Sequence, residues 1–190
     1  MTLTEPSDET LLARYGRGDA AAFEQLYRRH EMRIWHYLKR NVGNRATADE
    51  LMQEVWFAVA RDAARYAPSA RFTTWLFTIA HNRMIDSIRK NRRQSSMETV
   101  SYETDSAAAQ VIADPGMGPL AAAVAQDQTE AILKAVETLP DEQRSAFLLQ
   151  VEGELSVEEI AEITQTSFET TKSRLRYARA KLRDLLEEYA

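Results

Sequence analysis

The spacing of apolar residues along the first half of the chain is that of amphipathic helices. After Asp19, a residue type that caps helix N-termini, apolar side chains recur at three-, four- or seven-residue steps, as on one helical face. These positions are Phe23, Leu26, Tyr27, Ile34 and Leu38. Gly43 and Asn44 follow, and they are a typical stop signal for a helix.

Two more helices are predicted before residue 95. Thr47 and Glu50 have the spacing of a capping box, in which a hydroxyl and a carboxylate satisfy each other's backbone donors. A helix is therefore expected to open at Thr47. Pro68 and Ser69 interrupt the helical pattern, and a further helix is expected over residues 73–92.

The last third of the chain has the same helical spacing. Pro140 suits the first position of a helix, and Gly153 is expected to end that helix. Three of its apolar side chains are expected to face the core: Phe147, Leu148 and Val151. Because no segment has a convincing strand pattern, the expected fold class is all-α.

A short helix, a turn and a long helix are predicted at the end of the chain. Ser156 and Glu159 form a second capping box, which predicts the start of the short helix. Residues 164–166 make the turn, and Ser167 caps a helix that is expected to run to about Tyr189. This order of elements is typical of a helix-turn-helix motif.

The stretch of residues 95–126 differs in composition from both halves. It has no Lys or Arg, and its acids are Glu98, Glu103, Asp105 and Asp114. Since this composition cannot bury much apolar surface, we expect a flexible acidic linker. The chain is therefore expected to form two small helical domains, residues 1–94 and 127–190, joined by linker residues 95–126.

Composition narrows the class of protein further. The chain has 190 residues, of which 44% are hydrophobic, and its formal net charge is -5. It contains no Cys, so disulfides and thiolate metal sites are excluded. No apolar run approaches the ~20 residues that a membrane span needs, and residues 1–10 do not resemble a signal peptide. These features favour a soluble cytoplasmic protein without stable membrane insertion.

Residues 172–183 carry the strongest signal for nucleic-acid binding, because six of them are Lys or Arg and none is acidic. A helix that buries Leu175, Ala178 and Leu182 leaves basic side chains on its exposed flanks. Such side chains can enter a major groove and bind base edges or phosphates. The alternative is a solvated basic helix that pairs with the acidic helix before it. The short helix and the turn in front of it favour DNA binding.

Residues 49–57 suit docking to a protein partner. Their polar members share one helical side, next to large apolar groups: Asp49, Glu50, Gln53 and Glu54. Acids, an amide and apolar groups on one face can bind another protein. On composition alone, an ordinary amphipathic helix is the favoured alternative.

Residues 71–93 interleave aromatic, amide and basic side chains and end in a cationic cluster. Aromatic rings stack on unpaired bases, cations follow the phosphate backbone, and amides bind base edges. The neighbouring residues 65–70 could hold a base flipped out of the duplex. In the alternative interpretation, Phe72, Trp75 and Phe77 are core residues and the arginines are solvated.

Four motifs in this order resemble regions 2 and 4 of bacterial extracytoplasmic-function (ECF) sigma factors. They are ELMQEVW at 50–56, FTTWLFTIAHN at 72–82, LPDEQR at 139–144, and LSVEEIAEI at 155–163, which leads into TTKSRL at 170–175. The resemblance covers nearly the whole chain apart from the linker and the first few residues. It implies an alternative sigma factor, not an enzyme, that binds core RNA polymerase and directs it to promoters.

The resemblance also implies a role for each motif. Core RNA polymerase would dock on Glu50, Gln53 and Glu54. The −10 promoter element would be held by Tyr66, Pro68, Ser69, Ala70, Arg71, Asn82, Arg83, Arg89, Arg92 and Arg93. The −35 promoter element would be bound as duplex DNA by Lys172, Ser173, Arg174, Arg176, Tyr177 and Arg179. No catalytic residue, cofactor or metal is implied, and the family suggests a cognate anti-sigma factor as a further partner.

The helix-turn-helix departs from the family pattern at its turn. Gln165 stands where the family usually has a Gly, the residue that adopts a left-handed backbone most easily. This departure and the altered start of the last helix leave the individual −35 contacts open.

Three rival classes remain open on the residues alone. A DNA-binding repressor would leave residues 49–57 and 71–93 unexplained. An enzyme has little support, because His30, His36 and His81 lack the spacing of a metal site and no nucleophile motif or glycine-rich loop appears. A helical scaffold would show no salt-sensitive promoter binding.

Overall fold

The computed structural model describes residues 5–66, 71–95 and 131–187, and in these ranges every regular element is a helix. The elements are α1 (Asp8–Tyr15), α2 (Ala20–Val42), α3 (Arg45–Asp62), the 3-10 helix η1 (Ala63–Arg65), α4 (Phe72–Ser95), α6 (Asp141–Gly153), α7 (Val157–Ile163) and α8 (Phe168–Glu187). Residues 131–137 are also helical. The all-α prediction is confirmed. Linker residues 96–126 and the site candidates Pro68, Ser69 and Ala70 lie outside the described residues.

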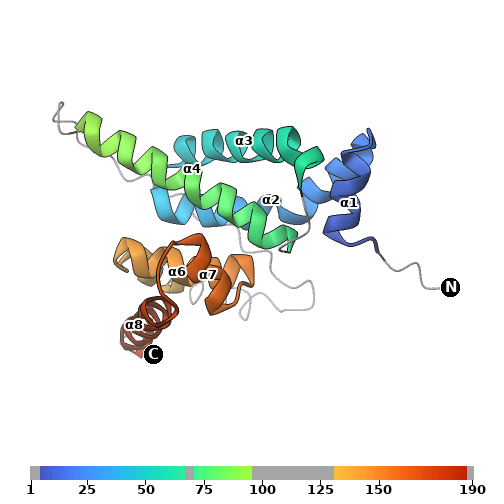
Figure 1. The fold of residues 1–190 in the computed structure, drawn as a ribbon. Coiled ribbons are helices and arrows are strands. Elements are labelled where there is room, and N and C mark those ends of the chain that lie inside the picture. The colour runs from blue at the N-terminus through green and yellow to red at the C-terminus, as the bar shows by residue number, and fades with distance from the viewer. Residues whose placement is uncertain (1–4, 67–70, 96–130, 188–190) are drawn as a thin grey trace, which may run out of the picture.

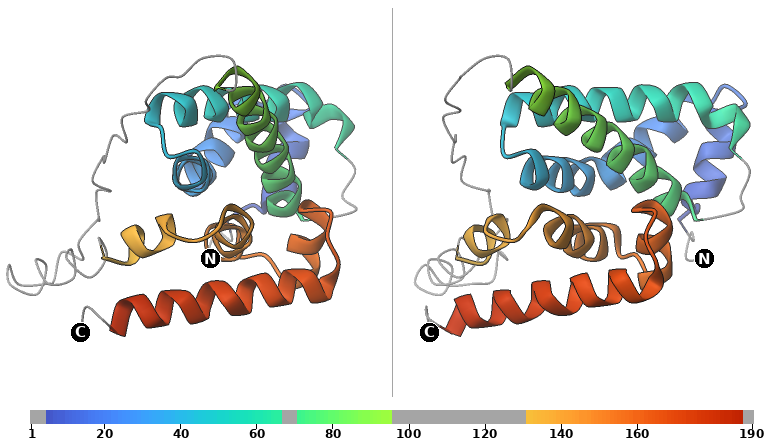
Figure 2. Two further views of the ribbon diagram at one scale, coloured as in Figure 1. Left: turned by 90° about the vertical axis from the view of Figure 1, so that its left-hand side faces the viewer. Right: turned by 60° about the vertical axis from the view of Figure 1, so that its left-hand side comes forward.

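The helices lie in successive layers (Figures 1 and 2). α3 forms one outer layer, α2 and α4 lie beneath it, α6 and α7 come next, and α8 forms the opposite outer layer. α1 packs against α2. The two halves of the chain pack directly on each other, because α6 contacts α2 and α4, and α7 contacts α4.

One apolar core runs through these layers. Its largest fully buried side chains come from both halves: Leu11, Leu12, Leu26, Ile34, Tyr37, Leu38, Phe72, Leu76, Phe77, Met84, Leu148 and Leu149. Full burial of one such apolar side chain stabilises a fold by about 1.5–3 kcal/mol. The contact between the halves is therefore part of a continuous core.

Helix α3 begins earlier than its sequence pattern predicted. The side chain of Asn44 accepts a hydrogen bond from the Thr47 backbone N–H at 3.0 Å, so Asn44 is the N-cap and Thr47 lies inside the helix. The predicted capping box of Thr47 and Glu50 is wrong. Asn is at least as favourable an N-cap residue as Thr. Gly43, whose φ is 75°, ends α2 in the left-handed conformation directly before Asn44.

The other predicted caps agree with the structure. Asp19 accepts the backbone N–H of Ala22, and Ser167 Oγ accepts that of Thr170 at 3.1 Å. The capping box of Ser156 and Glu159 is complete, because each side chain accepts the other residue's backbone N–H. Pro140 is the N-cap of α6 and not its first helical residue, which shifts the predicted start by one position.

Helix α6 presents a different face to the core from the one predicted. Leu148 and Leu149 are buried and Phe147 is half-buried, but Val151 is 53% exposed, so its predicted inward position is wrong. Residues four apart share one side of a helix, and the buried side passes from Leu148 to Glu152. Glu152 therefore takes an inward position that the apolar pattern did not assign.

Candidate polymerase and promoter interfaces

The outer side of α3 carries the candidate polymerase-binding residues. Glu50, Gln53 and Glu54 are all exposed. Gln53 lines a groove of about 260 Å³ between α2 and α3, whereas Glu50 and Glu54 line a groove of about 230 Å³ between α3 and α4. The three side chains therefore flank a ridge along α3 with a groove on each side.

Phe57 adds a large apolar side chain to this ridge. It is 74% exposed and lies four residues after Gln53, on the same helical side. Sequence reasoning gave Phe57 no role of its own. The i, i+4 spacing from Gln53 was the signal that could have found it.

The start of α4 is anchored by α1. The backbone N–H of Phe72 donates to Glu9 Oε1 at 3.0 Å, which satisfies one of the amides that a helix start leaves unpaired and lowers the pKa of Glu9. Phe72 and Phe77 are fully buried, so these two are core residues. Trp75 and Tyr66 are half-buried and lie together, with ring centroids 5.0 Å apart. Of the aromatic side chains at positions 66–77, this pair is therefore the one that is partly exposed.

Arg71, a candidate −10 residue, binds the helix-turn-helix half of the chain. Its guanidinium donates two hydrogen bonds to the carboxylate of Glu159, at 2.8 and 3.0 Å. Thr74 Oγ1 donates to the same carboxylate at 2.6 Å. Burial alone would raise the pKa of Glu159, but hydrogen bonds from Arg71, Thr74 and the Ser156 N–H outweigh it and lower the pKa to about 2. Glu159 is therefore charged at neutral pH.

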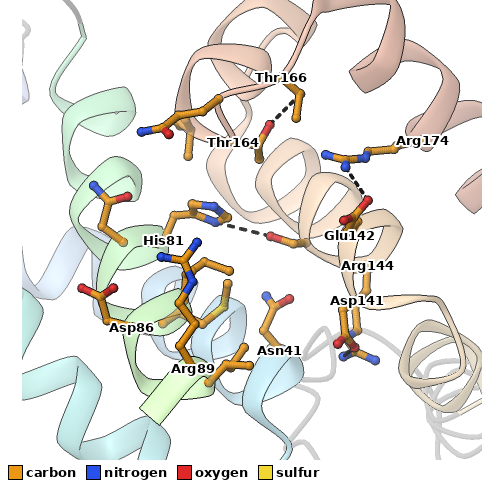
Figure 3. Close-up of a pocket in the computed structure, with 17 residues that line it drawn as sticks. Asn41, His81, Asp86, Arg89, Asp141, Glu142, Arg144, Thr164, Thr166 and Arg174 are labelled. Atoms are coloured by element: carbon orange, nitrogen blue, oxygen red, sulfur yellow. Dashed lines mark hydrogen bonds and ion pairs between the residues drawn. The ribbon is translucent and has the colours of Figure 1, made fainter. Parts of the chain in front are cut away.

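A cavity of about 620 Å³ separates the middle of α4 from the helix-turn-helix half (Figure 3). Asn82 and Arg89, two candidate −10 residues, line it together with Arg174, a candidate −35 residue. Arg83 lies on the other side of α4, where its guanidinium is 4.0 Å from the carboxylate of Glu54. The structure thus brings Asn82 and Arg89 to one face and places Arg83 beside the polymerase candidates.

The C-terminal end of α4 also contacts the second half of the chain. Arg92 donates to Asp141 Oδ2 at 2.9 Å, and Asp141 additionally pairs with Arg144 of its own helix at 2.6 Å. The Arg92 side chain is 73% exposed, and Arg93 beside it is exposed as well. One carboxylate at the start of α6 therefore pairs with a cation predicted to bind promoter phosphate.

The candidate −35 residues divide between two faces of α8. Lys172, Arg176 and Tyr177 are exposed on the outer side. The Arg176 guanidinium lies 4.9 Å from the centroid of the Tyr177 ring, and Lys172 Nζ lies 5.8 Å from that of Phe168. Each of these two cations therefore lies against an exposed aromatic ring of α8.

Two of the remaining −35 candidates, Arg174 and Arg179, contact α6. Arg174 pairs with Glu142 and is only 20% exposed, and Arg179 donates to Gln150 Oε1 at 2.5 Å. Ser173 is half-buried. Arg174 and Arg179 flank the buried stripe of α8 and attach α8 to α6, whereas Ser173 lies on the side of the helix opposite Leu175, Ala178 and Leu182.

The turn between α7 and α8 has a left-handed residue at the position that the family pattern implied. Gln165 has a φ of 53°. Hydroxyl groups hold the turn, since Thr166 Oγ1 lies 3.0 Å from Thr164 Oγ1 and 2.9 Å from Thr171 Oγ1. The turn is thus well connected although a non-Gly residue adopts the strained conformation.

Buried polar groups join the two halves, and sequence reasoning missed them. Hydrogen bonds join Tyr37 Oη to His81 Nδ1 at 2.8 Å and to Ser145 Oγ at 3.1 Å. Burial lowers the pKa of His81 to about 4, so its ring is neutral at neutral pH. Burial also raises the pKa of Tyr37. These residues come from α2, α4 and α6, and no local pattern in the sequence connects them.

Glu152 is the second buried link between the halves. It is 9% exposed, its carboxylate pairs with Arg40 of α2, and its backbone carbonyl accepts a hydrogen bond from Arg33 Nε at 2.5 Å. Arg33 also pairs with Glu154 at 3.3 Å. A buried carboxylate with a paired arginine fixes α6 against α2, because either charge alone would be costly to bury.

In the part of the chain that the structure describes, acidic and His side chains form no group that could hold a metal ion. Within the same residues, no helix has the length and apolar content needed to cross a membrane.

Comparison with known proteins agrees with this arrangement. The Sigma-70 region 2 family model matches residues 26–94, and the Sigma-70 region 4 model matches residues 129–182. RNA polymerase sigma factor CarQ of Myxococcus xanthus is 34% identical over 179 residues, which cover 93% of this chain and 96% of CarQ. ECF RNA polymerase sigma factor SigW of Bacillus subtilis is 29% identical over 90% of this chain and 92% of SigW. The chain belongs to the ECF sigma factors.

Solved structures share the fold of this sigma factor. CnrH in complex with the cytosolic domain of CnrY superimposes with a TM-score of 0.65 at 22% identity, over 97% of this chain and 100% of CnrH. RpoE in complex with the anti-sigma factor NepR from Bartonella quintana gives a TM-score of 0.69 at 23% identity, over 87% of this chain and 96% of RpoE. Membership of the ECF sigma factors decides against the repressor, enzyme and scaffold classes. Below, region 2 denotes residues 26–94 and region 4 denotes residues 129–182.

Proposed function

We propose that this sigma factor acts in the cytoplasm and binds core RNA polymerase through α3, the −10 element through α4, and the −35 element through α8. The arrangement of α3 and α8 carries the proposal. They form opposite outer layers (Figure 2), and each has a row of exposed side chains suited to its partner. Two different partners can therefore bind the two layers at once.

The polymerase contact would centre on the ridge of α3. Glu50, Gln53 and Glu54 would supply polar contacts, and Phe57 would supply the apolar centre that protein interfaces need. The two grooves beside the ridge would receive side chains of the polymerase. This geometry suits an elongated partner that lies along the helix.

The −10 contact would combine stacking with phosphate binding. Tyr66 and Trp75 would stack on an unpaired base, and Asn82 would bind a base edge. The phosphate backbone would be bound by the cations Arg71, Arg83, Arg89, Arg92 and Arg93. Residues 68–70 also stay part of this proposed site.

The −35 contact would use mainly the outer side of α8. Lys172, Arg176 and Tyr177 are free of α6 and can enter a major groove together. Ser173 lies on the same outer side and stays in the proposed site beside them. Arg174 and Arg179 stay in the proposed site as contacts at the edge of the groove. The pairing of Arg174 and Arg179 with α6 supports a positioning role for these two residues.

Control by an anti-sigma factor is the last part of the proposal. Two solved structures with this fold are complexes, one with the cytosolic domain of CnrY and one with the anti-sigma factor NepR. We propose that a protein of this kind also binds the present sigma factor and withholds it from polymerase.

Run-off transcription with purified core polymerase tests the proposed function. The double variant Gln53→Ala, Glu54→Ala should lose polymerase binding and all transcription, because two of the three polar contacts of the ridge are removed. Gln25→Ala, an exposed Gln on α2, is the matched control and should behave as the wild type. If the wild-type protein binds duplex DNA alone but never directs core polymerase to a promoter, the proposed function is wrong.

A further inference from the structure

Helix α1 precedes the residues that the region 2 family model matches, yet it holds the segment proposed to bind the −10 element. We propose that Glu9 of α1 is a positioning residue for −10 recognition. Its carboxylate caps the start of α4 and thereby keeps Trp75 against Tyr66, ready to stack on an unpaired base. This inference rests on the proposed function, because Tyr66 and Trp75 are proposed −10 residues.

The start of α4 receives its cap from another helix. The backbone N–H of Trp75 donates to the carbonyl of Arg71 at 3.2 Å, so Arg71 occupies the N-cap position of α4. An arginine side chain has only donors and cannot accept a backbone N–H, as Ser, Thr, Asp or Asn at this position would. Glu9 Oε1 instead accepts the N–H of Phe72 at 3.0 Å, from 63 positions away in the sequence. The first turn of α4 therefore depends on α1 for this hydrogen bond.

Glu9 is held in place because its neighbour Asp8 binds α2. The Asp8 carboxylate lies 2.7 Å from His30 Nε2 and 2.5 Å from a guanidinium nitrogen of Arg29. His30 is 2% exposed, and its ring centroid lies 5.4 Å from that of Phe72. Two consecutive acids thus connect the first turn of α1 to α2 and to the start of α4. The Glu9 carboxylate is therefore fixed relative to both helices.

The hydrogen bond to Glu9 fixes the aromatic pair through the first turn of α4. Phe72 is fully buried, and its ring centroid lies 6.0 Å from that of Trp75, three residues later on the same side of the helix. Tyr66 lies at the end of η1, which α1 also contacts. Burial raises the pKa of Tyr66, and the nearby charges of Glu9 and Asp8 raise it further. Helix α1 therefore lies beside both members of the aromatic pair.

A fixed aromatic pair binds a base more tightly than a mobile one. Side chains that become ordered during binding cost free energy, which a site ordered in advance does not lose. Without the Glu9 carboxylate, the Phe72 N–H loses its partner and the first turn of α4 frays. Because Trp75 lies in that turn, its position against Tyr66 then varies. Base capture should weaken, whereas the exposed sides of α3 and α8 lie elsewhere and should keep their contacts.

Three substitutions separate the hydrogen bond of Glu9 from its charge. Glu9→Ala removes the acceptor, whereas Glu9→Gln removes the charge but keeps an oxygen that can accept the Phe72 N–H. Glu5→Ala is the matched control, because Glu5 is an 87% exposed acid that pairs with Arg29 at 3.3 Å. Amide hydrogen exchange, measured by NMR on the free proteins, reports directly on the Phe72 N–H.

Base capture is measured with each variant bound to core polymerase. The probe is a forked promoter DNA with an unpaired −10 strand, selected from random sequences by the wild-type holoenzyme. A fluorescent base analogue at the −10 positions reports on a base that leaves the stack. Binding of core polymerase and binding of a duplex −35 probe are measured in parallel, since a general loss of structure would weaken all three.

We expect Glu9→Ala to bind the forked probe about fivefold more weakly, which is the loss typical of one helix cap, and to give a smaller fluorescence change. Its Phe72 N–H should exchange faster. Glu9→Gln and Glu5→Ala should stay within about twofold of the wild type and keep this N–H protected. All three variants should bind core polymerase and the −35 probe like the wild type.

Wild-type binding of the forked probe by Glu9→Ala would overturn the role of Glu9. An equal loss in Glu9→Gln would assign the effect to charge and overturn positioning through the Phe72 hydrogen bond. A parallel loss of polymerase and −35 binding by Glu9→Ala would show a general loss of structure and overturn it as well. If the wild-type holoenzyme selects no promoter DNA, the proposed function fails instead, and the exchange of the Phe72 N–H distinguishes the two failures.

Discussion

The two helices proposed to bind DNA have different surroundings. α8 forms an outer layer and presents Lys172, Arg176 and Tyr177 to solvent, whereas α4 lies between α3 and region 4 (Figure 2). Arg71 and Arg92 near the ends of α4 are paired with carboxylates of region 4. Both helices look like basic DNA-binding segments in the sequence. Their difference shows that the tertiary contact decides which cations are available.

Substitution of Glu152 is expected to have the largest effect on the contact between region 2 and region 4. Glu152→Ala leaves Arg40 buried without its partner in the packed arrangement, which should weaken the contact by about 3–5 kcal/mol. Small-angle X-ray scattering should show an increased radius of gyration, while circular dichroism should show retained helices. Glu154→Ala removes an exposed pair with Arg33 and should change the contact by at most about 1 kcal/mol. Unchanged compactness of Glu152→Ala would exclude this role for Glu152.

Acid should also weaken the contact, through His81. Burial lowers the pKa of His81 from 6.5 to about 4, so the separated state binds a proton more readily than the packed state. The stability of the contact is therefore complete above pH 6.5 and falls as the pH is lowered to 4. The loss is at most about 3 kcal/mol, which corresponds to a His81 ring that becomes fully hydrated in the separated state. Glu159, with a pKa of about 2, stays charged throughout this window.

Scattering or fluorescence measured between pH 7 and pH 4 would detect this opening. His81→Gln cannot take up the proton and should remove the pH dependence in that window, while Gln can still bond to Tyr37. The same acid transition in His81→Gln would assign the effect to another group.

On α8, the two faces should respond differently to substitution. Lys172→Ala and Arg176→Ala should each weaken −35-dependent initiation by about 1–3 kcal/mol, because each removes a contact to a base or a phosphate. Arg174→Ala should lower the melting temperature more than either, because its pair with Glu142 is lost. Run-off transcription and polymerase binding should be measured together. Equal loss of both activities in Arg176→Ala would mean that α8 is only structural.

The smallest expected effect is at the turn before α8. Gln165 has a left-handed backbone, which costs a non-Gly residue roughly 1 kcal/mol. Gln165→Gly should raise the free energy of unfolding by at most about 1 kcal/mol, since the greater freedom of Gly in the unfolded chain offsets part of the gain. Gln165→Ala keeps the strain and is the control. Thermal denaturation measures both, and destabilisation by Gly would contradict this explanation.

The features that could be predicted from the sequence are local. The caps at Asp19, Ser156 and Ser167 agree with the structure because a cap is formed by residues within one turn of each other. The capping box at Thr47 was wrong because Asn44, three residues earlier, is an equally good cap and comes first. Local patterns also place the exposed sides of α3 and α8, which present Glu50, Gln53 and Glu54 and Lys172, Arg176 and Tyr177.

The contact between the regions could not be predicted in this way. Tyr37 bonds to residues that are 44 and 108 positions away in the sequence, and no periodic pattern links them. Glu152 is buried and Val151 is exposed, because the buried side of α6 is set by the helices it packs against. Similarly, the sequence indicates that Arg71 is a cation of the proposed −10 site, but it identifies Glu159 only as part of a capping box. Long-range packing decides these features.

The distance between region 2 and region 4 is the most direct test of whether the contact between them decides which cations are available to promoter DNA. Because the chain has no Cys, fluorescent labels can be attached at Gln25→Cys on α2 and Glu137→Cys in region 4, two exposed positions outside the proposed sites. We expect efficient energy transfer in the free protein and a loss of transfer when core polymerase and promoter DNA are added. A transcribing complex in which the transfer efficiency is unchanged would contradict this claim, because Arg71 and Arg92 would still be paired with region 4.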